Sequence, residues 1–172
     1  MVNERRHSDP SKPVVFELMY QPNLGLATAV SRCALAFYRQ YVSDTDVLSR
    51  LRIASQELLE NAALYSLDGE TSFRLEVACE GSDLVITIRI TNRADSEDIA
   101  RLKESFGGLE QAADAREYYD TLMCRVAKRE RLSGLGLGRI NAEPEMQLRY
   151  EVDQDQVSVV ASTRCSKEVA DE

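Results

Sequence analysis

The chain has 172 residues, of which 44% are hydrophobic and 29% charged, and it carries a formal net charge of −8 with a pI near 4.8. This length and composition are typical of one globular domain and argue against disordered, collagen-like and membrane-spanning classes. The acidic field repels a phosphate backbone, so we expect no nucleic acid and no membrane as a direct partner. A protein partner or a small ligand fits this charge better.

The cysteines and the histidine exclude several kinds of site. The four cysteines lie far apart without a Cys-x-x-Cys pair, which favours reduced thiols in a cytoplasmic protein. Residues 1–13 contain no apolar core of a signal peptide, so we expect a flexible tail and no export. The single histidine, His7, lies in this tail. A Ser-His-Asp triad, a Cys-His pair and a histidine zinc site therefore lack their imidazole.

The first half of the chain predicts a strand, two helices and a hairpin. Residues 14–20 alternate between two faces, as in a strand. A helix capped by Asn23 then runs to Tyr41, and a second helix follows at once, where Ser43 and Asp46 resemble a capping box. After an Asp-Gly turn, two alternating segments form an antiparallel hairpin with one buried face. The buried positions expected here are Ala27, Val30, Ala34, Phe37 or Tyr38, Tyr41, Leu51, Ala54, Leu58, Ala62, Tyr65, Phe73, Leu75, Val77, Cys79, Leu84, Ile86, Ile88 and Ile90.

The second half of the chain is less regular and more charged. Residues 95–131 predict a short helix, a break at Gly107 and Gly108, and a second helix. Residues 133–140 form a glycine-rich turn. Two alternating segments within residues 146–163 then predict a closing hairpin.

This order of elements predicts an α/β (α+β) two-layer sandwich, in which a mixed, mainly antiparallel sheet has helices on one face. The chain lacks the regular strand and helix alternation of a doubly wound parallel sheet. We assign one domain to residues 14–165, between an N-terminal tail of residues 1–13 and a C-terminal tail of residues 166–172.

Two polar residues on the second predicted helix are candidates for chemistry. Glu57 and Asn61 lie four residues apart and so project from the same face, about 100° round from the apolar stripe. A carboxylate can act as a general base, and an amide oxygen suits a magnesium ion that also contacts phosphates. Taken alone, the pair also fits an ordinary solvated helix face.

The second candidate is the glycine-rich segment at residues 133–140, which reads Ser-Gly-Leu-Gly-Leu-Gly-Arg-Ile. Gly134 and Gly136 allow backbone N–H groups to approach an anion, and a helix that starts after them adds a favourable dipole. The segment is neither a Rossmann fingerprint nor a P-loop, because no strand precedes it and no Gly-Lys-Ser/Thr follows. A plain turn between two elements is the alternative.

A cluster of basic residues precedes these glycines, at Arg125, Lys128, Arg129 and Arg131. Such a cluster is commonly a solvated face of a helix. Because it comes directly before Gly134, it is also placed to offset the charge of a bound phosphate in an otherwise acidic protein. The sequence leaves both interpretations open.

Taken together, the two motifs resemble those of the GHKL (Bergerat-fold) ATP-binding proteins, closest to the anti-sigma-factor serine kinases. Residues 56–66, Gln-Glu-Leu-Leu-Glu-Asn-Ala-Ala-Leu-Tyr-Ser, resemble the N box with its pattern E-x-x-x-N-A. Residues 133–137 resemble the second glycine box. The order of the predicted elements follows that of the family over nearly the whole chain.

The resemblance implies a role for each residue that matches one of the two boxes. Glu57 would be the catalytic base, and Asn61 would bind Mg²⁺. Gly134 and Gly136 would cradle the phosphates of ATP. ATP and Mg²⁺ are therefore the expected cofactors.

The chain departs from the family at the first glycine box. In place of D-x-G-x-G, residues 91–96 read Thr-Asn-Arg-Ala-Asp-Ser and contain no glycine. Asn92 offers a neutral carbonyl oxygen where the family has an Asp that accepts a hydrogen bond from the adenine amino group. In this respect the chain is similar to the SiaB-type branch of bacterial regulators. Residues 95–132 would form the ATP lid, with Arg131 at its end beside the nucleotide.

The resemblance implies a cytoplasmic partner-switching regulator that binds Mg-ATP. It would phosphorylate a Ser or Thr on a STAS-like anti-anti-sigma partner, or sequester a sigma factor. The alternative is a non-catalytic interaction module of the same fold that has lost nucleotide binding, which the missing first glycine box favours and the intact N box opposes. A histidine-kinase catalytic domain fits less well, because it needs a separate histidine-bearing partner.

The resemblance also implies a homodimer. The first strand and first helix carry more large aromatic side chains than one helix face needs to bury, which agrees with that expectation. These residues are Phe16, Tyr20, Phe37, Tyr38 and Tyr41.

Overall fold

The computed structural model describes residues 12–67, 69–127 and 134–167, and most of the two predicted tails lies outside these ranges. Its strands are β1 (Val14–Tyr20), β2 (Thr71–Glu80), β3 (Asp83–Arg93), β4 (Gln147–Asp153) and β5 (Gln156–Ser166). They form one sheet in the order β1-β2-β3-β5-β4, and each of these pairings is antiparallel. The expected α+β class is confirmed, and the sheet is antiparallel throughout the described strands rather than mixed.

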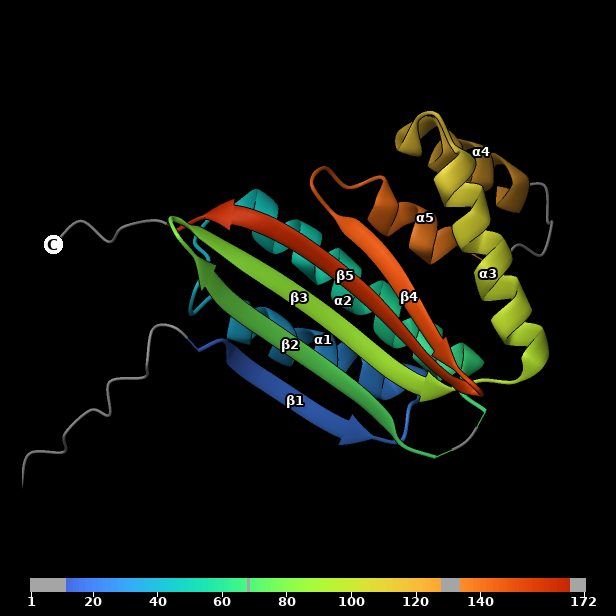
Figure 1. Ribbon diagram of the computed structural model, residues 1–172, viewed down its shortest axis with the longest axis horizontal. Coiled ribbons are helices and arrows are strands. Elements are labelled where there is room, and N and C mark those ends of the chain that lie inside the picture. Colours follow the sequence, from blue (N-terminus) through green and yellow to red (C-terminus); the bar gives the residue numbers. More distant parts are fainter. Residues whose placement is uncertain (1–11, 68, 128–133, 168–172) are drawn as a thin grey trace, which may run out of the picture.

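The helices cover one face of this sheet (Figure 1). They are α1 (Leu24–Tyr38), α2 (Thr45–Tyr65), α3 (Ser96–Gln111), α4 (Ala115–Ala127) and α5 (Leu135–Asn141). The antiparallel pair α1 and α2 lies behind the sheet, and α5 packs beside α2. The helices α3 and α4 gather beyond β4, in the segment between β3 and β4 that the sequence assigned to a lid.

The core lies between the sheet and helices α1 and α2. Alternate residues of the β2–β3 hairpin face the helices and are buried, as the sequence pattern predicts. On the helical side, the stripe through Leu51, Ala54 and Leu58 is fully buried. Two residues expected to be buried are exposed, Cys79, two residues before the turn at Gly81, and Tyr41, after the end of α1.

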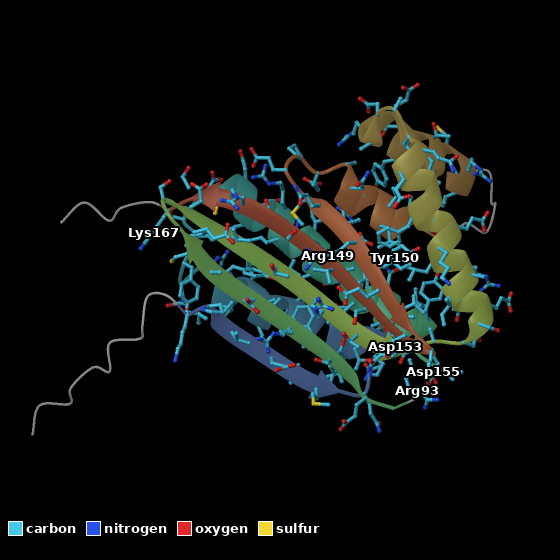
Figure 2. The ribbon with its side chains drawn as sticks, viewed as in Figure 1. Arg93, Arg149, Tyr150, Asp153, Asp155 and Lys167 are labelled. Carbon is cyan, nitrogen blue, oxygen red and sulfur yellow. The ribbon has the colours of Figure 1, made fainter. Side chains whose placement is uncertain are left out.

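The opposite face of the sheet is open and polar (Figure 2). Its charged side chains pair across neighbouring strands, as in the Arg89–Glu151 pair at 2.8 Å. At the β4–β5 turn, Arg93 bonds Asp155 at 2.6 Å, and these two side chains lie beside each other in Figure 2. Exposed pairs of this kind stabilise a fold by only about 0–1 kcal/mol each, so this face is a solvated surface.

The start of α2 differs from the prediction. Asp44, not Ser43, is the N-cap, and its Oδ1 accepts the backbone N–H groups of Asp46 at 2.8 Å and Val47 at 3.1 Å. The bonds from Val47 and Asp46 hold the pKa of the Asp44 carboxyl below its usual range. Asp and Ser are about equally common as N-caps, and the negative charge of Asp44 also interacts favourably with the positive end of the helix dipole. The predicted cap of α1 is confirmed, because Oδ1 of Asn23 accepts the Leu26 N–H at 2.9 Å.

The predicted break at Gly107 and Gly108 is wrong, because α3 continues through both glycines. A Cβ on Gly108 would overlap the Tyr118 hydroxyl, so this glycine lets α4 approach α3 closely. Phe106 and Leu109 on the same helix are buried. Their burial offsets the poor helix propensity of two adjacent glycines.

Four of the five aromatic residues that suggested self-association, all except Tyr20, pack against one another within the chain. The ring of Phe37 lies 5.8 Å from that of Phe16 and 5.3 Å from that of Tyr41, and Tyr38 is fully buried. This cluster ties β1 to α1 and to the turn that follows α1, which ends at Tyr38, three residues earlier than expected. The predicted homodimer therefore loses one of its arguments and stays a prediction.

A buried hydrogen bond between α1 and α2 provides a test of this packing. The Tyr38 hydroxyl and the Ser55 hydroxyl are 2.9 Å apart, and both residues are fully buried. We predict that Tyr38→Phe lowers the free energy of unfolding by about 1–2 kcal/mol, because it leaves Ser55 without its partner. Adding Ser55→Ala should recover part of this loss. Urea denaturation of the single and double variants measures both values, and an additive double variant would contradict the bond.

Candidate functional site

A small cavity of about 70 Å³ lies between the C-terminal half of α2, the end of β3 and helix α3. Three of the predicted site residues, Asn61, Asn92 and Gly134, line it together. The structure thus brings together residues from three separate parts of the sequence. The apolar part of the lining includes Leu58, Ala62, Ile90, Leu102, Leu137, Val157 and Val159.

The two asparagines place amide groups at this apolar cavity. Asn61 projects from α2, is half-buried, and has no hydrogen-bond partner within residues 12–67, 69–127 and 134–167. Asn92 is the second-last residue of β3, paired with Val157 of β5, and its Nδ2 donates to the Arg93 carbonyl at 3.0 Å. The Asn61 amide is therefore available to a ligand, whereas one donor of Asn92 is already used.

Gly134 is the N-cap of α5 and has a left-handed backbone, with φ at +88°. A Cβ at this position would lie 2.7 Å from Oγ and 2.9 Å from Cβ of Ser105 on α3. Glycine thus meets two requirements here, a positive φ and a close approach of α3. The predicted glycine turn is in fact one left-handed residue followed at once by a short helix.

Glu57, the predicted base, lies one turn before Asn61 and is not part of the cavity lining. Its Oε1 accepts a hydrogen bond from Arg139 on α5 at 2.9 Å, and the Glu57 side chain is only 16% exposed. A Cβ on Gly136 would lie 2.6 Å from the other carboxylate oxygen. Gly136 therefore makes room for the Glu57–Arg139 pair, which joins α2 to α5.

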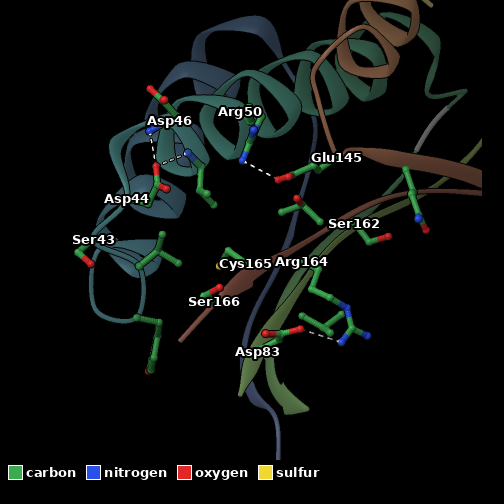
Figure 3. Close-up of a pocket in the computed structure, with 16 residues that line it drawn as sticks. Ser43, Asp44, Asp46, Arg50, Asp83, Glu145, Ser162, Arg164, Cys165 and Ser166 are labelled. Carbon is green, nitrogen blue, oxygen red and sulfur yellow. Dashed lines mark hydrogen bonds and ion pairs between the residues drawn. The ribbon is translucent and has the colours of Figure 1, made fainter. Parts of the chain in front are cut away.

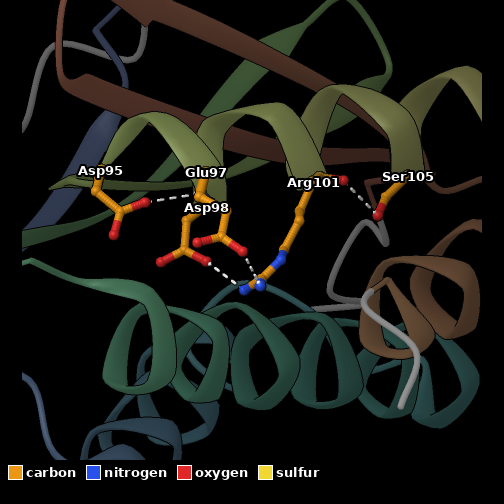
Figure 4. Close-up of polar contacts among 5 residues, drawn as sticks. All are labelled: Asp95, Glu97, Asp98, Arg101 and Ser105. Carbon is orange, nitrogen blue, oxygen red and sulfur yellow. Dashed lines mark hydrogen bonds and ion pairs between the residues drawn. The ribbon is translucent and has the colours of Figure 1, made fainter. Parts of the chain in front are cut away.

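Helix α3 brings polar residues to the cavity that the sequence analysis did not single out. Asp98, Arg101 and Ser105 of α3 all line it. Figure 4 shows Asp98 and Arg101 on the side of α3 that faces α2, with the Arg101 guanidinium bonded to Asp98 at 3.0 Å and also to Glu97. Ser105 donates to the Arg101 carbonyl at 2.9 Å. The spacing of Glu97, Asp98 and Arg101 by three and four residues in the sequence could have indicated that these side chains pair on one face of a helix.

The predicted basic cluster is only partly visible. Arg131, assigned to nucleotide binding, lies outside the described residues, as do Lys128 and Arg129. Arg125 is exposed on α4. Within the described ranges, no three His, Cys, Asp or Glu side chains come together as a metal site.

The size of the cavity depends on α3. Small-molecule sites in proteins commonly measure roughly 300–1,000 Å³. This cavity is smaller than that, and α3 forms one of its sides, where the Phe106 ring packs 4.5 Å from the Tyr150 ring on β4. A ligand of nucleotide size therefore requires a wider opening than this conformation has.

Comparison with known proteins identifies a fold but no family. No family model matches the chain, and neither does any curated protein. Among solved structures, one chain of the crystal structure of the SiaB–SiaC complex from Pseudomonas aeruginosa is similar, with a TM-score of 0.57. The sequences are 12% identical, and the match covers 86% of this chain and 89% of that one.

At this identity the match shows the fold alone. The protein belongs to the class of α+β sandwiches with helices on one face of an antiparallel sheet. Within that class, its fold is SiaB-like. None of the helices described here has both the length and the hydropathy needed to cross a membrane.

The close contact at Gly134 yields a prediction with a matched control. Gly134→Ala should lower the free energy of unfolding by about 1–2 kcal/mol, because of its positive φ and the clash with Ser105. Gly107→Ala should raise it by up to about 1 kcal/mol, since Gly107 is helical and a Cβ there meets no atom within 4 Å. Thermal and urea unfolding measure both. Equal effects at the two positions would contradict the close packing of α3 on Gly134.

Proposed function

We propose that this protein is a partner-switching signalling regulator, which binds Mg-ATP at the α2–α3 cavity and acts on a partner protein similar to SiaC. The observation that supports this most is the meeting of Asn61, Asn92 and Gly134 at one cavity. These are the positions to which the resemblance to the anti-sigma-factor serine kinases assigns the nucleotide. The similar solved chain is part of a complex with its own partner protein, SiaC.

The residues at the cavity have the chemical character that a magnesium nucleotide needs. Apolar side chains such as Ile90, Val157 and Val159 suit the flat faces of an adenine ring. The Asn61 amide has no partner among the described residues, and an amide oxygen is a ligand that Mg²⁺ accepts. The volume fits only once α3 has moved, so binding and lid opening are coupled in this proposal.

Bound Mg-ATP would supply the phosphoryl group for transfer. The carboxylate of Glu57 would accept the proton of a Ser or Thr hydroxyl on the partner, which is the work of a general base. Arg139 now holds that carboxylate, so the ion pair has to open before Glu57 can accept a proton. Asn61 would hold the Mg²⁺. Asn92 would contact the adenine ring through its side-chain carbonyl oxygen, because its NH₂ group already donates to the Arg93 carbonyl.

A second function is favoured by two specific observations. Glu57 is paired with Arg139 instead of being free to act as a base, and the cavity of about 70 Å³ is smaller than a usual small-molecule site. In that case the protein is a non-catalytic interaction module, in which α3 and α5 are fixed parts of the scaffold. The next two experiments separate this function from the first.

Mg-ATP binding is tested by thermal unfolding. A ligand at about 100 times its dissociation constant adds about 2.7 kcal/mol to the free energy of unfolding, so we expect millimolar Mg-ATP to raise the melting temperature. Asn61→Ala should abolish most of this shift, because the nucleotide loses its magnesium ligand. Gly107→Ala, which lies on α3 away from the cavity lining, should retain it. The absence of any shift for the folded wild-type chain would favour the interaction module.

Catalysis is tested separately from binding at Glu57. Glu57→Gln retains a hydrogen bond to Arg139 but removes the basic carboxylate. We therefore expect ATP affinity to survive, phosphotransfer to fall by roughly 100-fold or more, and stability to change by no more than about 1 kcal/mol. Calorimetric titration gives the affinity, and radiolabelled ATP with a SiaC-like partner gives the transfer rate. Transfer at the wild-type rate would exclude Glu57 as the base.

A further inference from the structure

A groove of about 890 Å³ lies at the end of the sheet away from the cavity, and the two share no lining residue. One wall is the turn between α1 and α2 with the first turns of α2, and the other is the last part of β5 (Figure 3). Figure 3 shows Asp44, Asp46 and Arg50 on the helical wall, and Arg164 and Ser166 on the sheet wall.

The sheet wall of this groove is an unpaired strand edge. β4 begins at Gln147, opposite Ser162, so residues 163–166 of β5 pair with β3 on one side and with no described strand on the other. The chain turns aside just before β4, where the Met146 N–H donates to the Glu143 carbonyl at 3.3 Å. The sheet therefore has a gap of one short strand, directly in line with β4.

The free backbone groups of this edge are those of Arg164 and Ser166. In an antiparallel strand the backbone groups of successive residues point alternately to the two neighbouring strands. The Lys167 N–H bonds the Ser82 carbonyl on the β3 side at 2.9 Å. Arg164 and Ser166 consequently present their N–H and C=O groups to the groove, two residues apart as in any strand. Such a row is a template for another strand.

Two buried polar atoms in the groove also lack partners. Thr163 lines the groove and is only 3% exposed, yet its Oγ1 has no hydrogen-bond partner within the described residues. The same is true of Nε of Arg50, whose other nitrogen bonds Glu145 at 3.2 Å. Buried polar groups normally have a hydrogen-bond partner, so these two atoms are available to a polar ligand in the groove. Tyr20, Ser66 and Thr71 also have such an atom among the described residues, and none of these three lines the groove.

The charges that line the groove favour a ligand with a positive charge. Its lining contains four carboxylates and two guanidinium groups, a formal balance of −2. Arg50 bonds Glu145, and Arg164 bonds Asp83. Asp44 and Asp46, at the start of α2, have no basic side chain bonded to them among the described residues. A ligand with a positive side chain near this helix start balances them.

We propose that this groove binds an extended peptide segment of a partner protein, which adds a short strand to the free edge of β5 and carries a Lys or Arg opposite Asp44 and Asp46. In this mode of recognition the backbone provides the affinity and the side chains provide the specificity. The groove is remote from the α2–α3 cavity, so the inference goes beyond the proposed function and does not require nucleotide binding.

The probe for the experiment is the synthetic peptide acetyl-Thr-Val-Arg-Val-Thr-amide, titrated into the ¹⁵N-labelled full chain and followed by amide NMR. We expect the largest shifts at the amides of Thr163, Arg164 and Ser166, with saturation at millimolar peptide. Replacing the arginine of the probe by glutamate should weaken binding by at least tenfold. Methylating the alternate backbone nitrogens of the probe should abolish it, because strand addition requires their hydrogens.

Substitutions in the protein, instead of in the peptide, test the same contacts. Ser166→Pro removes an N–H that faces the groove and leaves the β3 pairing intact, so we expect at least a tenfold loss of affinity with an otherwise unchanged spectrum. Ser166→Ala keeps the N–H and should bind like the wild type. Asp46→Lys should reverse the preference for arginine over glutamate in the probe.

Three results would overturn the proposal. The first is the absence of shifts at residues 163–166 with millimolar peptide. The second is an equal response along β1 or β4, the outer strands of the sheet, since this would mean unspecific pairing with any edge. The third is a shift of the same amides when Arg5 and Arg6 are replaced by glutamate without any peptide, because the chain's own N-terminal segment would then be the occupant.

Discussion

The burial of α2 against the sheet is the constraint on which both candidate sites depend. Leu51, Leu58 and Leu59 are fully buried along this helix, and each contributes roughly 1.5–3 kcal/mol. Their stripe fixes the rotation of the helix. As a result, Asn61 faces the cavity near one end of α2, and Arg50 faces the groove near the other. A change in the rotation of this single helix would disturb both sites at once.

In the proposed function, the packing of α3 adds a free-energy cost to ligand binding. An outward movement of α3 would separate Phe106 from Tyr150 and expose Leu109, and a ligand would have to offset that cost. The apparent dissociation constant equals the intrinsic one divided by the fraction of open molecules. If the proposed function holds, a well-packed α3 would weaken nucleotide binding without any change in the residues that touch the nucleotide. Contacts with a partner protein that favour the open form would strengthen it.

Most of the fold could be predicted from the sequence, because a helix or strand with one buried face has a clear periodicity of apolar residues. The β2–β3 and β4–β5 hairpins and the stripe of α2 follow from local spacing. Contacts between distant segments were not predictable in this way. The Glu57–Arg139 bond joins residues 82 positions apart, and nothing local to either residue indicates it. The glycines of α3 misled the prediction, since the need for space arises only when α4 packs beside them.

The strand order has a consequence for the segment between β3 and β4. The β2–β3 and β4–β5 hairpins each have a tight turn, and the pairing of β3 with β5 joins the two hairpins into one sheet. Helices α3, α4 and α5 lie between the hairpins in the sequence. The entropy of closing such a loop grows only with the logarithm of its length, about 0.6 kcal/mol for each doubling. The entropy of loop closure therefore places little limit on the length of the connections within this helical segment. The limit comes from packing, because Phe106, Leu137 and Ile140 of α3 and α5 belong to the same buried core as the sheet.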